Sequence, residues 1–228
     1  MDKFPLAQSF AKSITDNVLG IFVDVGEVGV DSLLEDEVIK GIPILSTVSS
    51  LYSVGKTIYT RHNMAKLYTF IQEINNNLVD VEQRSRYSEN FKANAQERDR
   101  ELTYLMIILE RYIALDKPRF LAKIYIAYID GEISWQDVCK YSEVIDRFLP
   151  GDYGTLCSGE TYKTEKDEGT DALQRLIALG LIIEEIRKSN VIQDGGTINI
   201  DPPEIMEKKE RLYRRTEFGN VLIGIIEK

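Results

Sequence analysis

The sequence predicts a mainly α-helical protein, in which a helical bundle body precedes a C-terminal module with a small β-hairpin. Apolar side chains recur at helical spacing through most of residues 1–150, glycine and acidic residues interrupt this pattern over 151–170, and strand-like segments follow. We therefore predict a Gly/Ser/Val-rich amphipathic helical region at 1–60, a helical body at 61–150, a linker at 151–170 and the hairpin-containing module at 171–228.

The composition excludes several classes of protein. The chain has 228 residues, of which 43% are hydrophobic, and this is enough for a packed core in one large or two small domains. A single histidine and two isolated cysteines exclude the usual zinc frameworks and histidine-based catalytic sites, and we expect no cofactor. Without paired cysteines or a secretory segment at 1–10, the expected location is the cytoplasm.

The net charge of −9 is distributed unevenly along the chain. Residues 1–60 carry −4, residues 61–120 carry +1, residues 121–170 carry −5 and residues 171–228 carry −1. The acidic segments would be repelled by nucleic acid and by anionic lipid headgroups. The charge therefore favours contact with protein over contact with a phosphate backbone.

Residues 1–60 contain one apolar run at 18–23 and a predicted helix that begins at Pro43. This helix has a face of small hydroxyl side chains opposite an apolar stripe. The longest stretch without charge, 41–55, is too short for a conventional membrane-spanning helix. We expect the stripe either to pack in the core, as amphipathic helices usually do, or to contact a sister subunit, a protein partner or a membrane surface. The candidate interaction residues of this stripe are Ile44, Val48, Leu51, Tyr52 and Tyr59.

From residue 61 to about residue 115 the pattern predicts two long antiparallel helices. The stretch 82–101 between their apolar stripes is polar and charged, and it could continue a helix or form a connection. The predicted stripes are Leu67, Phe70, Ile71, Ile74, Leu78 and Val81, and then Leu102, Leu105, Met106, Leu109, Tyr112 and Ile113.

A helical hairpin follows between Pro118 and Pro150. Asp130 and Gly131 supply its turn, and Ser134 with Asp137 resembles a capping box that begins the second helix. Beyond the predicted linker, a helix over 171–179 ends at Gly180, and a short strand lies at 181–183. Residues 191–200 are predicted as a hairpin that turns at 194–196, and the last helix begins near Thr216.

This last block resembles the winged-helix proteins. The resemblance rests on Ala172-Leu-Gln-Arg-Leu-Ile-Ala-Leu-Gly-Leu-Ile182, the following hairpin, and Tyr213-Arg-Arg-Thr-Glu-Phe-Gly219. It implies that Gln174 and Arg175 lie on a recognition helix, beside Asp171. A nucleic-acid-binding member would use them on base edges, with Lys208, Lys209, Arg214 and Arg215, from a basic cluster that also contains Arg211, on phosphates. The net charge of −1 favours a protein-contact or structural module instead.

Catalytic patterns are absent from the sequence. There is no nucleophile elbow, no His-Glu-x-x-His and no CxxC motif, so we predict no enzyme activity and no catalytic residue. His62 is predicted as a surface or capping side chain, and Cys139 and Cys157 as structural residues.

Residues 35–150 also resemble a loosely defined group of uncharacterised bacterial proteins, some of which occur in phage or abortive-infection contexts. The resemblance rests on the amphipathic segment 42–56 and on the Ile129-Asp-Gly-Glu-Ile133 turn. It implies a non-enzymatic interaction or effector protein, related to phage defence, that self-associates, binds a protein partner or touches a membrane peripherally. The alternative is a winged-helix transcriptional regulator that binds nucleic acid.

Overall fold

The computed structural model describes residues 4–16, 36–51, 58–77, 81–163, 171–192 and 205–228. The chain divides into two compact units, Met1–Arg147 and Phe148–Lys228. Helices dominate, with one small antiparallel sheet, so the prediction of a mainly α-helical protein is confirmed. Tyr52, the predicted apolar run at 18–23 and the predicted turn at 194–196 lie outside the described residues.

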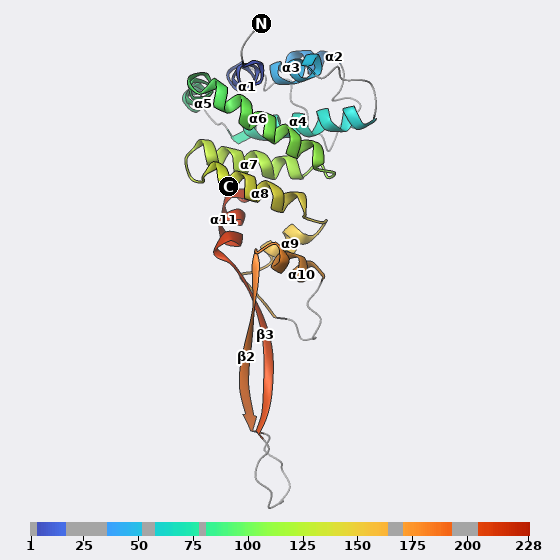
Figure 1. Cartoon of the computed structure of the whole chain (residues 1–228), viewed down its shortest axis with the longest axis vertical. Helices are drawn as coiled ribbons and strands as arrows, with labels where there is room; N and C mark the ends of the chain where they lie inside the picture. Colours follow the sequence, from blue (N-terminus) through green and yellow to red (C-terminus); the bar gives the residue numbers. More distant parts are fainter. Residues whose placement is uncertain (1–3, 17–35, 52–57, 78–80, 164–170, 193–204) are drawn as a thin grey trace, which may run out of the picture. The chain divides into compact units, whose positions relative to one another are not determined.

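The first unit consists of packed helices (Figure 1). Helix α1 packs against α3, α5 and α6, and α7 packs between α4 and α8. The bounds of these helices are α1 (Pro5–Thr15), α2 (Asp36–Gly41), α3 (Pro43–Leu51), α4 (Ile58–Asn77), α5 (Val81–Ala93), α6 (Ala95–Arg111), α7 (Lys117–Ile129) and α8 (Trp135–Asp146).

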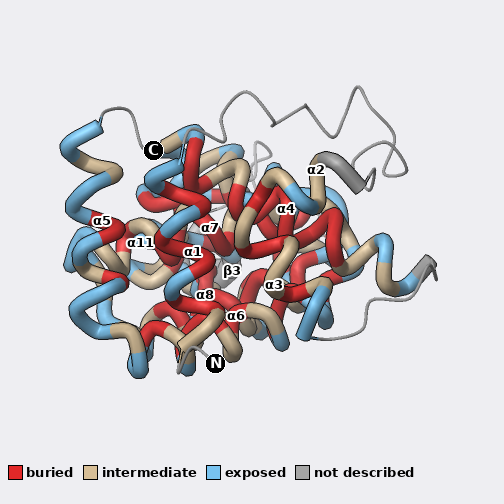
Figure 2. Tube along the Cα trace, turned by 90° about the horizontal axis from the view of Figure 1, so that it is seen from above, coloured by how far each residue is buried: buried red, intermediate tan, exposed pale blue. Residues whose placement is uncertain are grey.

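Helix α1, which the sequence did not predict, lies in the core of this unit, and Figure 2 shows its trace as largely buried. Leu6, Phe10 and Ile14 follow one another at intervals of four residues and are buried. The carboxylate of Asp99 accepts hydrogen bonds from the N–H groups of Leu6 and Ala7, at 3.0 and 3.1 Å. A residue far along the chain therefore caps the first turn of α1.

The prediction of two long helices over 61–115 is wrong in number, because α4, α5 and α6 occupy this region. Most of the predicted stripe residues on α4 and α6 are buried, but Val81 and Ile113 are exposed. Helix α5 turns only a narrow face inward, formed by Tyr87, Ser88 and Phe91. The charged stretch is thus helical, and it is supported by two aromatic anchors.

The helical hairpin of α7 and α8 is confirmed. Gly131 adopts a positive φ of 78°, and the N–H of Glu132 bonds to the carbonyl of Ala127, which ends α7 in a Schellman motif. The hydroxyl of Ser134 accepts from the N–H of Asp137, whose carboxylate accepts from the N–H of Ser134. This reciprocal capping box fixes the beginning of α8 where the sequence predicted it.

The second unit contains a sheet with the strand order β1–β3–β2, in which both pairs are antiparallel. The prediction of a linker over 151–170 is wrong for 152–163, since this segment forms α9 and the edge strand β1. The predicted short strand and separate hairpin are replaced by two long strands that pair continuously. The bounds are α9 (Asp152–Cys157), β1 (Thr161–Lys163), α10 (Asp171–Ala178), β2 (Ile182–Ile192), β3 (Ile205–Arg215) and α11 (Glu217–Ile226).

The junction between α10 and α11 agrees with the predicted helix ends. Gly180 ends α10 with a φ of 73°. Thr216 caps α11, because its hydroxyl accepts from the N–H of Gly219 at 3.0 Å while it donates to the carbonyl of Gly180 at 2.8 Å. The end of one helix is therefore tied to the beginning of the other, at the base of the β2–β3 hairpin.

Candidate interaction surfaces

The predicted apolar stripe of α3 is split between the core and the surface. Ile44 and Val48 are buried, so assigning them to an exposed interaction face is wrong. The hydroxyl of Ser13 on α1 accepts from the N–H of Ile44 at 3.0 Å, which places α1 against this face of α3. Leu51 and Tyr59 remain exposed, at 47% and 60%. The covering helix was not predicted, and this is why a core face resembled a free one.

A second group of exposed apolar side chains lies where the first turn of α4 meets the end of α6. We call Tyr59, Ile107 and Ile113 the α4/α6 patch, and their exposures are 60%, 55% and 84%. The hydroxyl of Tyr59 bonds to the carboxylate of Glu110, which raises the pKa of the tyrosine. These contacts place the first turn of α4 beside the last turn of α6.

Two side chains of α4 hold this end of α6 in place. Nε2 of His62 donates to the carbonyl of Ile113 at 2.8 Å. Nζ of Lys66 donates to the carbonyls of Glu110 and Tyr112, at 2.8 and 2.7 Å. These carbonyls lie at the carboxyl end of the helix, where backbone acceptors lack intrahelical partners and where a cation is favoured. The α4/α6 patch therefore lies on a fixed framework, and His62 has the capping role that the sequence predicted.

Lys66 is a buried cation, with only 1% of its surface exposed. Burial lowers the pKa of its ammonium group to about 8, and the nearby Glu110 carboxylate partly opposes this shift. Its donors are directed at backbone carbonyls rather than at an open site. We therefore assign Lys66 a structural role beneath the α4/α6 patch.

On the second unit, the two predicted recognition-helix residues differ in their surroundings. Gln174 is exposed on α10. Arg175 instead forms a paired contact with the carboxylate of Asp152, with Nη2 at 2.6 Å from Oδ1 and Nε at 3.1 Å from Oδ2. Asp152 is fully buried, and its Oδ2 also accepts from the N–H of Leu149 at 2.8 Å. The guanidinium of Arg175 is thus bound within its own unit.

The arginines near the base of the hairpin also have carboxylate partners. Arg214 pairs with Glu185 at 2.8 Å, Arg211 with Glu184 at 3.4 Å, and Arg215 with Glu160 at 3.7 Å. Lys208 and Lys209 lie on β3, opposite Ser189 and Lys188 in the register. Sequence reasoning placed these cations in one cluster, but it could not show that carboxylates on β2 and before β1 neutralise the arginines.

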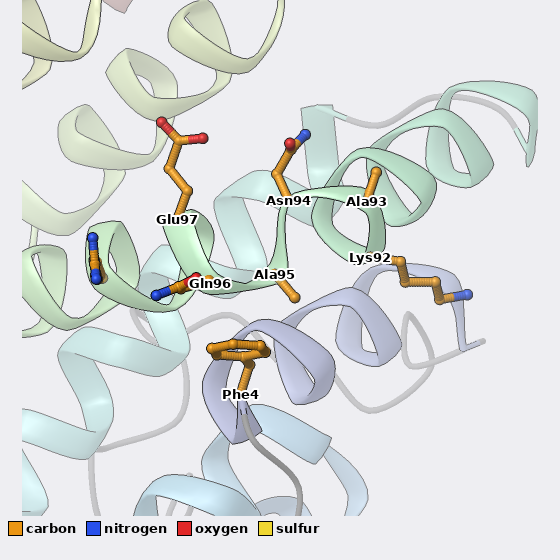
Figure 3. Close-up of a pocket in the computed structure, with 8 residues that line it drawn as sticks. Phe4, Lys92, Ala93, Asn94, Ala95, Gln96 and Glu97 are labelled. Atoms are coloured by element: carbon orange, nitrogen blue, oxygen red, sulfur yellow. The ribbon is translucent and has the colours of Figure 1, made fainter.

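A shallow hollow of about 580 Å³ lies between the beginning of α1 and the junction of α5 with α6 (Figure 3). Phe4 forms its apolar wall beside Ala95, and its polar lining includes Lys92, Glu97 and Arg100. Most of these side chains are exposed, and the residues that line the hollow include no nucleophile hydrogen-bonded to a base. The hollow offers no arrangement that we can assign to a reaction.

A buried ionic group between α6 and α7 also makes structural contacts. Nη1 of Arg98 contacts the carboxylate of Glu101 and donates to the hydroxyl of Tyr128 at 2.8 Å, and Tyr128 donates to Glu101 at 2.6 Å. The three side chains bond to one another between α6 and α7, while the buried Nε of Arg98 has no hydrogen-bond partner among the described residues. Elsewhere, burial raises the pKa of the Cys157 thiol, so that it stays protonated at neutral pH.

In the part of the chain that the structure describes, no group of three or more histidine, cysteine or acidic side chains is arranged to hold a metal ion. Within the same ranges, no helix has the length and apolar content that a bilayer crossing requires.

The fold and surfaces define a class only in broad terms: a mainly helical protein with a small antiparallel sheet. No protein-family model, curated protein or solved structure matches the chain. The likeness to winged-helix proteins and to bacterial proteins of phage contexts therefore stays a prediction from the sequence.

Proposed function

We propose that the protein is a non-enzymatic interaction protein, of the effector or adaptor kind, whose second unit is a winged-helix-like protein-contact module. The order of α10, β2, β3 and α11 supports the winged-helix likeness, because helix, two hairpin strands and helix follow one another in that family. The sequence resemblance extends the proposal to bacterial phage defence. Plaque counts on cells with and without the gene would test that context.

The observation that carries the proposal is the pairing of arginines with carboxylates on the second unit. Phosphate-backbone binding requires cations that can replace the counterions of the nucleic acid. In a DNA-binding winged helix, Arg175 would point at base edges, but here its guanidinium is bound by the buried carboxylate of Asp152. Arg214 and Arg215 already have acidic partners. A surface neutralised in this way suits a protein partner better than a polyanion.

We place the contact for a protein partner at the α4/α6 patch. Exposed aromatic and aliphatic side chains with a hydrogen-bonded polar rim are typical of protein interfaces. Tyr59 and Ile113 supply the apolar part, and Glu110 and His62 lie at its rim. Of the predicted interaction residues, Tyr59 belongs to this patch, whereas Ile44 and Val48 are buried and do not.

Binding to nucleic acid tests the first part of the proposal. Labelled duplex DNA and single-stranded RNA would be titrated with the full chain at low and at physiological salt. We expect no saturable rise in anisotropy at either salt. Saturable binding that weakens steeply as salt rises would contradict the proposal, because that slope is the signature of phosphate contacts.

Site-specific photo-cross-linking tests the second part. Benzoylphenylalanine replaces Ile113 in the cells that naturally make the protein, and the same residue at the exposed position Glu89 of α5 is the matched control. We expect a protein adduct from position 113 and none from position 89. A lipid adduct from position 113 would assign the patch to a membrane surface, and the absence of any specific adduct would remove the patch as a contact.

One observation favours the nucleic-acid-binding regulator as a second candidate. The register pairs the backbone of Lys188 with that of Lys209, next to Lys208, so three basic residues occupy neighbouring positions of the two strands. Clustered basic residues are what binding to a phosphate backbone requires. The salt titration decides between the two candidates, since Lys208→Glu together with Lys209→Glu should abolish binding only if this ribbon contacts phosphates.

A further inference from the structure

Strand β2 lies at the edge of the sheet, where β3 is its one strand neighbour among the described residues. An edge strand presents a row of backbone N–H and C=O groups that can pair with another chain. Proteins usually shorten, bulge or interrupt such edges. Strand β2 is 11 residues long, contains no proline, and pairs with β3 without a bulge from Ile182 to Ile192. This edge therefore has the geometry that pairing requires.

The centre of β2 has a sequence that is complementary to itself. It reads Glu184-Glu-Ile-Arg-Lys188, with two acids before Ile186 and two bases after it. Two antiparallel copies related by a two-fold axis through Ile186 would place Glu185 opposite Arg187 of the second copy. The same axis places Glu184 opposite Lys188. Four opposite-charge pairs would form around one apolar contact, and Glu184 and Glu185, which pair with Arg211 and Arg214 within the hairpin, would then each have a cation on both sides.

Among two-fold axes through the charged centre of β2, symmetry favours this register. A two-fold axis between antiparallel edge strands runs perpendicular to the sheet, so it must pass through a residue that faces its own copy. An axis through Glu185 would place two carboxylates opposite each other, and one through Arg187 would place two guanidinium groups together. Like charges directly opposite are destabilising. Between Glu184 and Lys188, only Ile186 is uncharged.

The exposed side chains agree with this axis. Ile186 is 60% exposed and Ile183 is 46% exposed, so apolar side chains lie open to solvent on this edge strand. Pairing would therefore cover apolar surface.

Strand β3 lacks these properties. Every residue from Glu207 to Arg211 is charged, so any two-fold axis on that segment would place a charge opposite itself. Figure 1 shows β2 and β3 extending as a ribbon beyond α9 and α10. The complementary edge of this ribbon is that of β2.

We propose that two copies of the chain associate through antiparallel pairing of their β2 edges around Ile186, which forms a continuous β3–β2–β2–β3 sheet. This goes beyond the proposed function, because it identifies the partner as a second copy and uses a surface other than the α4/α6 patch. Backbone hydrogen bonds supply the affinity, and the Glu-Glu-Ile-Arg-Lys pattern supplies the register.

Charge reversal tests the pairing in the full chain. Arg187→Glu places Glu185 opposite a second glutamate, and Glu185→Arg places Arg187 opposite a second arginine. By sedimentation velocity over a concentration series, we expect each variant alone to weaken dimerisation by about tenfold or more. A mixture of the two variants should regain it, because opposite charges again face each other. Arg100→Glu, an exposed reversal on α6, is the matched control.

A disulfide tests the register independently. Cys139 and Cys157, which are free thiols, are replaced with serine, and Ile186→Cys is then introduced. Residues directly opposite in an antiparallel pair lie within disulfide range. Mild oxidation should join two Ile186→Cys chains through a disulfide, whereas Ile183→Cys, which lies opposite Ser189 of the second copy, should form no covalent dimer.

Several results would overturn the inference. A monomer at every concentration, a dimer that Arg187→Glu weakens no more than Arg100→Glu, or a mixture without recovery would each do so. A dimer that ignores Arg187→Glu but dissociates with Ile113→Asp would belong to the α4/α6 patch. That result would overturn the β2 pairing while supporting the proposed function.

Discussion

At the residue scale, Asp152 contributes to the stability of the second unit, although the sequence placed it in a predicted linker. Its fully buried carboxylate binds both Arg175 and the N–H of Leu149. We expect Asp152→Ala to lower the free energy of unfolding by about 2 kcal/mol, because a buried backbone donor loses its acceptor. Arg175→Met should also lower it, since the carboxylate would stay buried without a cation.

Urea unfolding of these variants gives the measurement, with Gln174→Met as the matched control on the exposed neighbour. The control should leave the midpoint unchanged. If Arg175→Met is as stable as the control, the guanidinium is free to point away from the unit. The assignment of Arg175 to structure would then be withdrawn.

Lys66 gives the protein a pH dependence in the alkaline range. Burial lowers the pKa of its ammonium group to about 8, whereas the unfolded chain keeps a value near the ordinary 10.5. Between these values the unfolded state binds more protons, so the free energy of unfolding rises as the pH rises. We expect wild type to gain about 2 kcal/mol relative to Lys66→Met between pH 7.5 and 9.5.

The comparison with Lys66→Met cancels the titration of tyrosines and cysteines elsewhere. Denaturant unfolding at the two pH values measures the gain. A difference between wild type and variant that stays constant with pH would show that Lys66 keeps its ordinary affinity for a proton.

At the element scale, helices with local signals could be predicted from the sequence. The Ser134 capping box, the positive-φ glycines at 131 and 180, and the Thr216 cap all lie where the pattern placed them. Each of these signals involves residues that are neighbours in the chain. This is why the ends of α7, α8, α10 and α11 agree with expectation.

Elements that depend on distant partners could not be predicted. Helix α1 is capped by Asp99, and β1 exists because it pairs with β3 near Tyr213. Each partner lies far away in the sequence, so no local pattern in α1 or β1 indicates it. The candidate sites failed for the same reason: α1 covers Ile44 and Val48, and Asp152 binds Arg175. The sequence shows which of these side chains are apolar and which is charged, but it does not show which residue each one contacts.

Helix α11 contains two glycines with opposite requirements. A Cβ at Gly219 would lie 2.5 Å from the carbonyl oxygen of Leu181, whereas one at Gly224 would meet nothing within 4 Å. We expect Gly219→Ala to lower the free energy of unfolding by about 2 kcal/mol, because backbone must shift. Gly224→Ala should raise it by about 0.5 kcal/mol through helix propensity.

Thermal and urea unfolding of the full chain compare the two variants. The same substitution in the same helix thus isolates the close approach of α11 to Leu181 from propensity. If both variants change stability in the same direction, the contact between Gly219 and the end of α10 is not rigid.

At the scale of the whole molecule, the net charge of −9 is less informative than the way charges are paired. The acidic excess was predictable by counting, but the partner of each arginine was not. The contacts of Arg211 with Glu184 and of Arg214 with Glu185 follow from the register of β2 against β3. That register is set over 11 residues of pairing between segments that lie apart in the sequence.

The division into two compact units predicts that they lose stability separately. Phe10 is buried in the first unit, where its ring lies 4.6 Å from that of Phe91 and 6.3 Å from that of Tyr125. Phe10→Ala should cost about 4 kcal/mol in that unit. By hydrogen exchange on the full chain, amides of α4, α6 and α7 should then exchange about a thousandfold faster.

Amides of α10, α11 and the base of the hairpin should keep their wild-type rates in this variant, because the packing that Phe10 supports lies within 1–147. Gly219→Ala supplies the reciprocal experiment, with faster exchange confined to the second unit. Acceleration of both units by either substitution would mean that the chain unfolds as one cooperative structure. A contact made by the hairpin, such as pairing of β2 edges, would then be coupled to the stability of the helical unit as well.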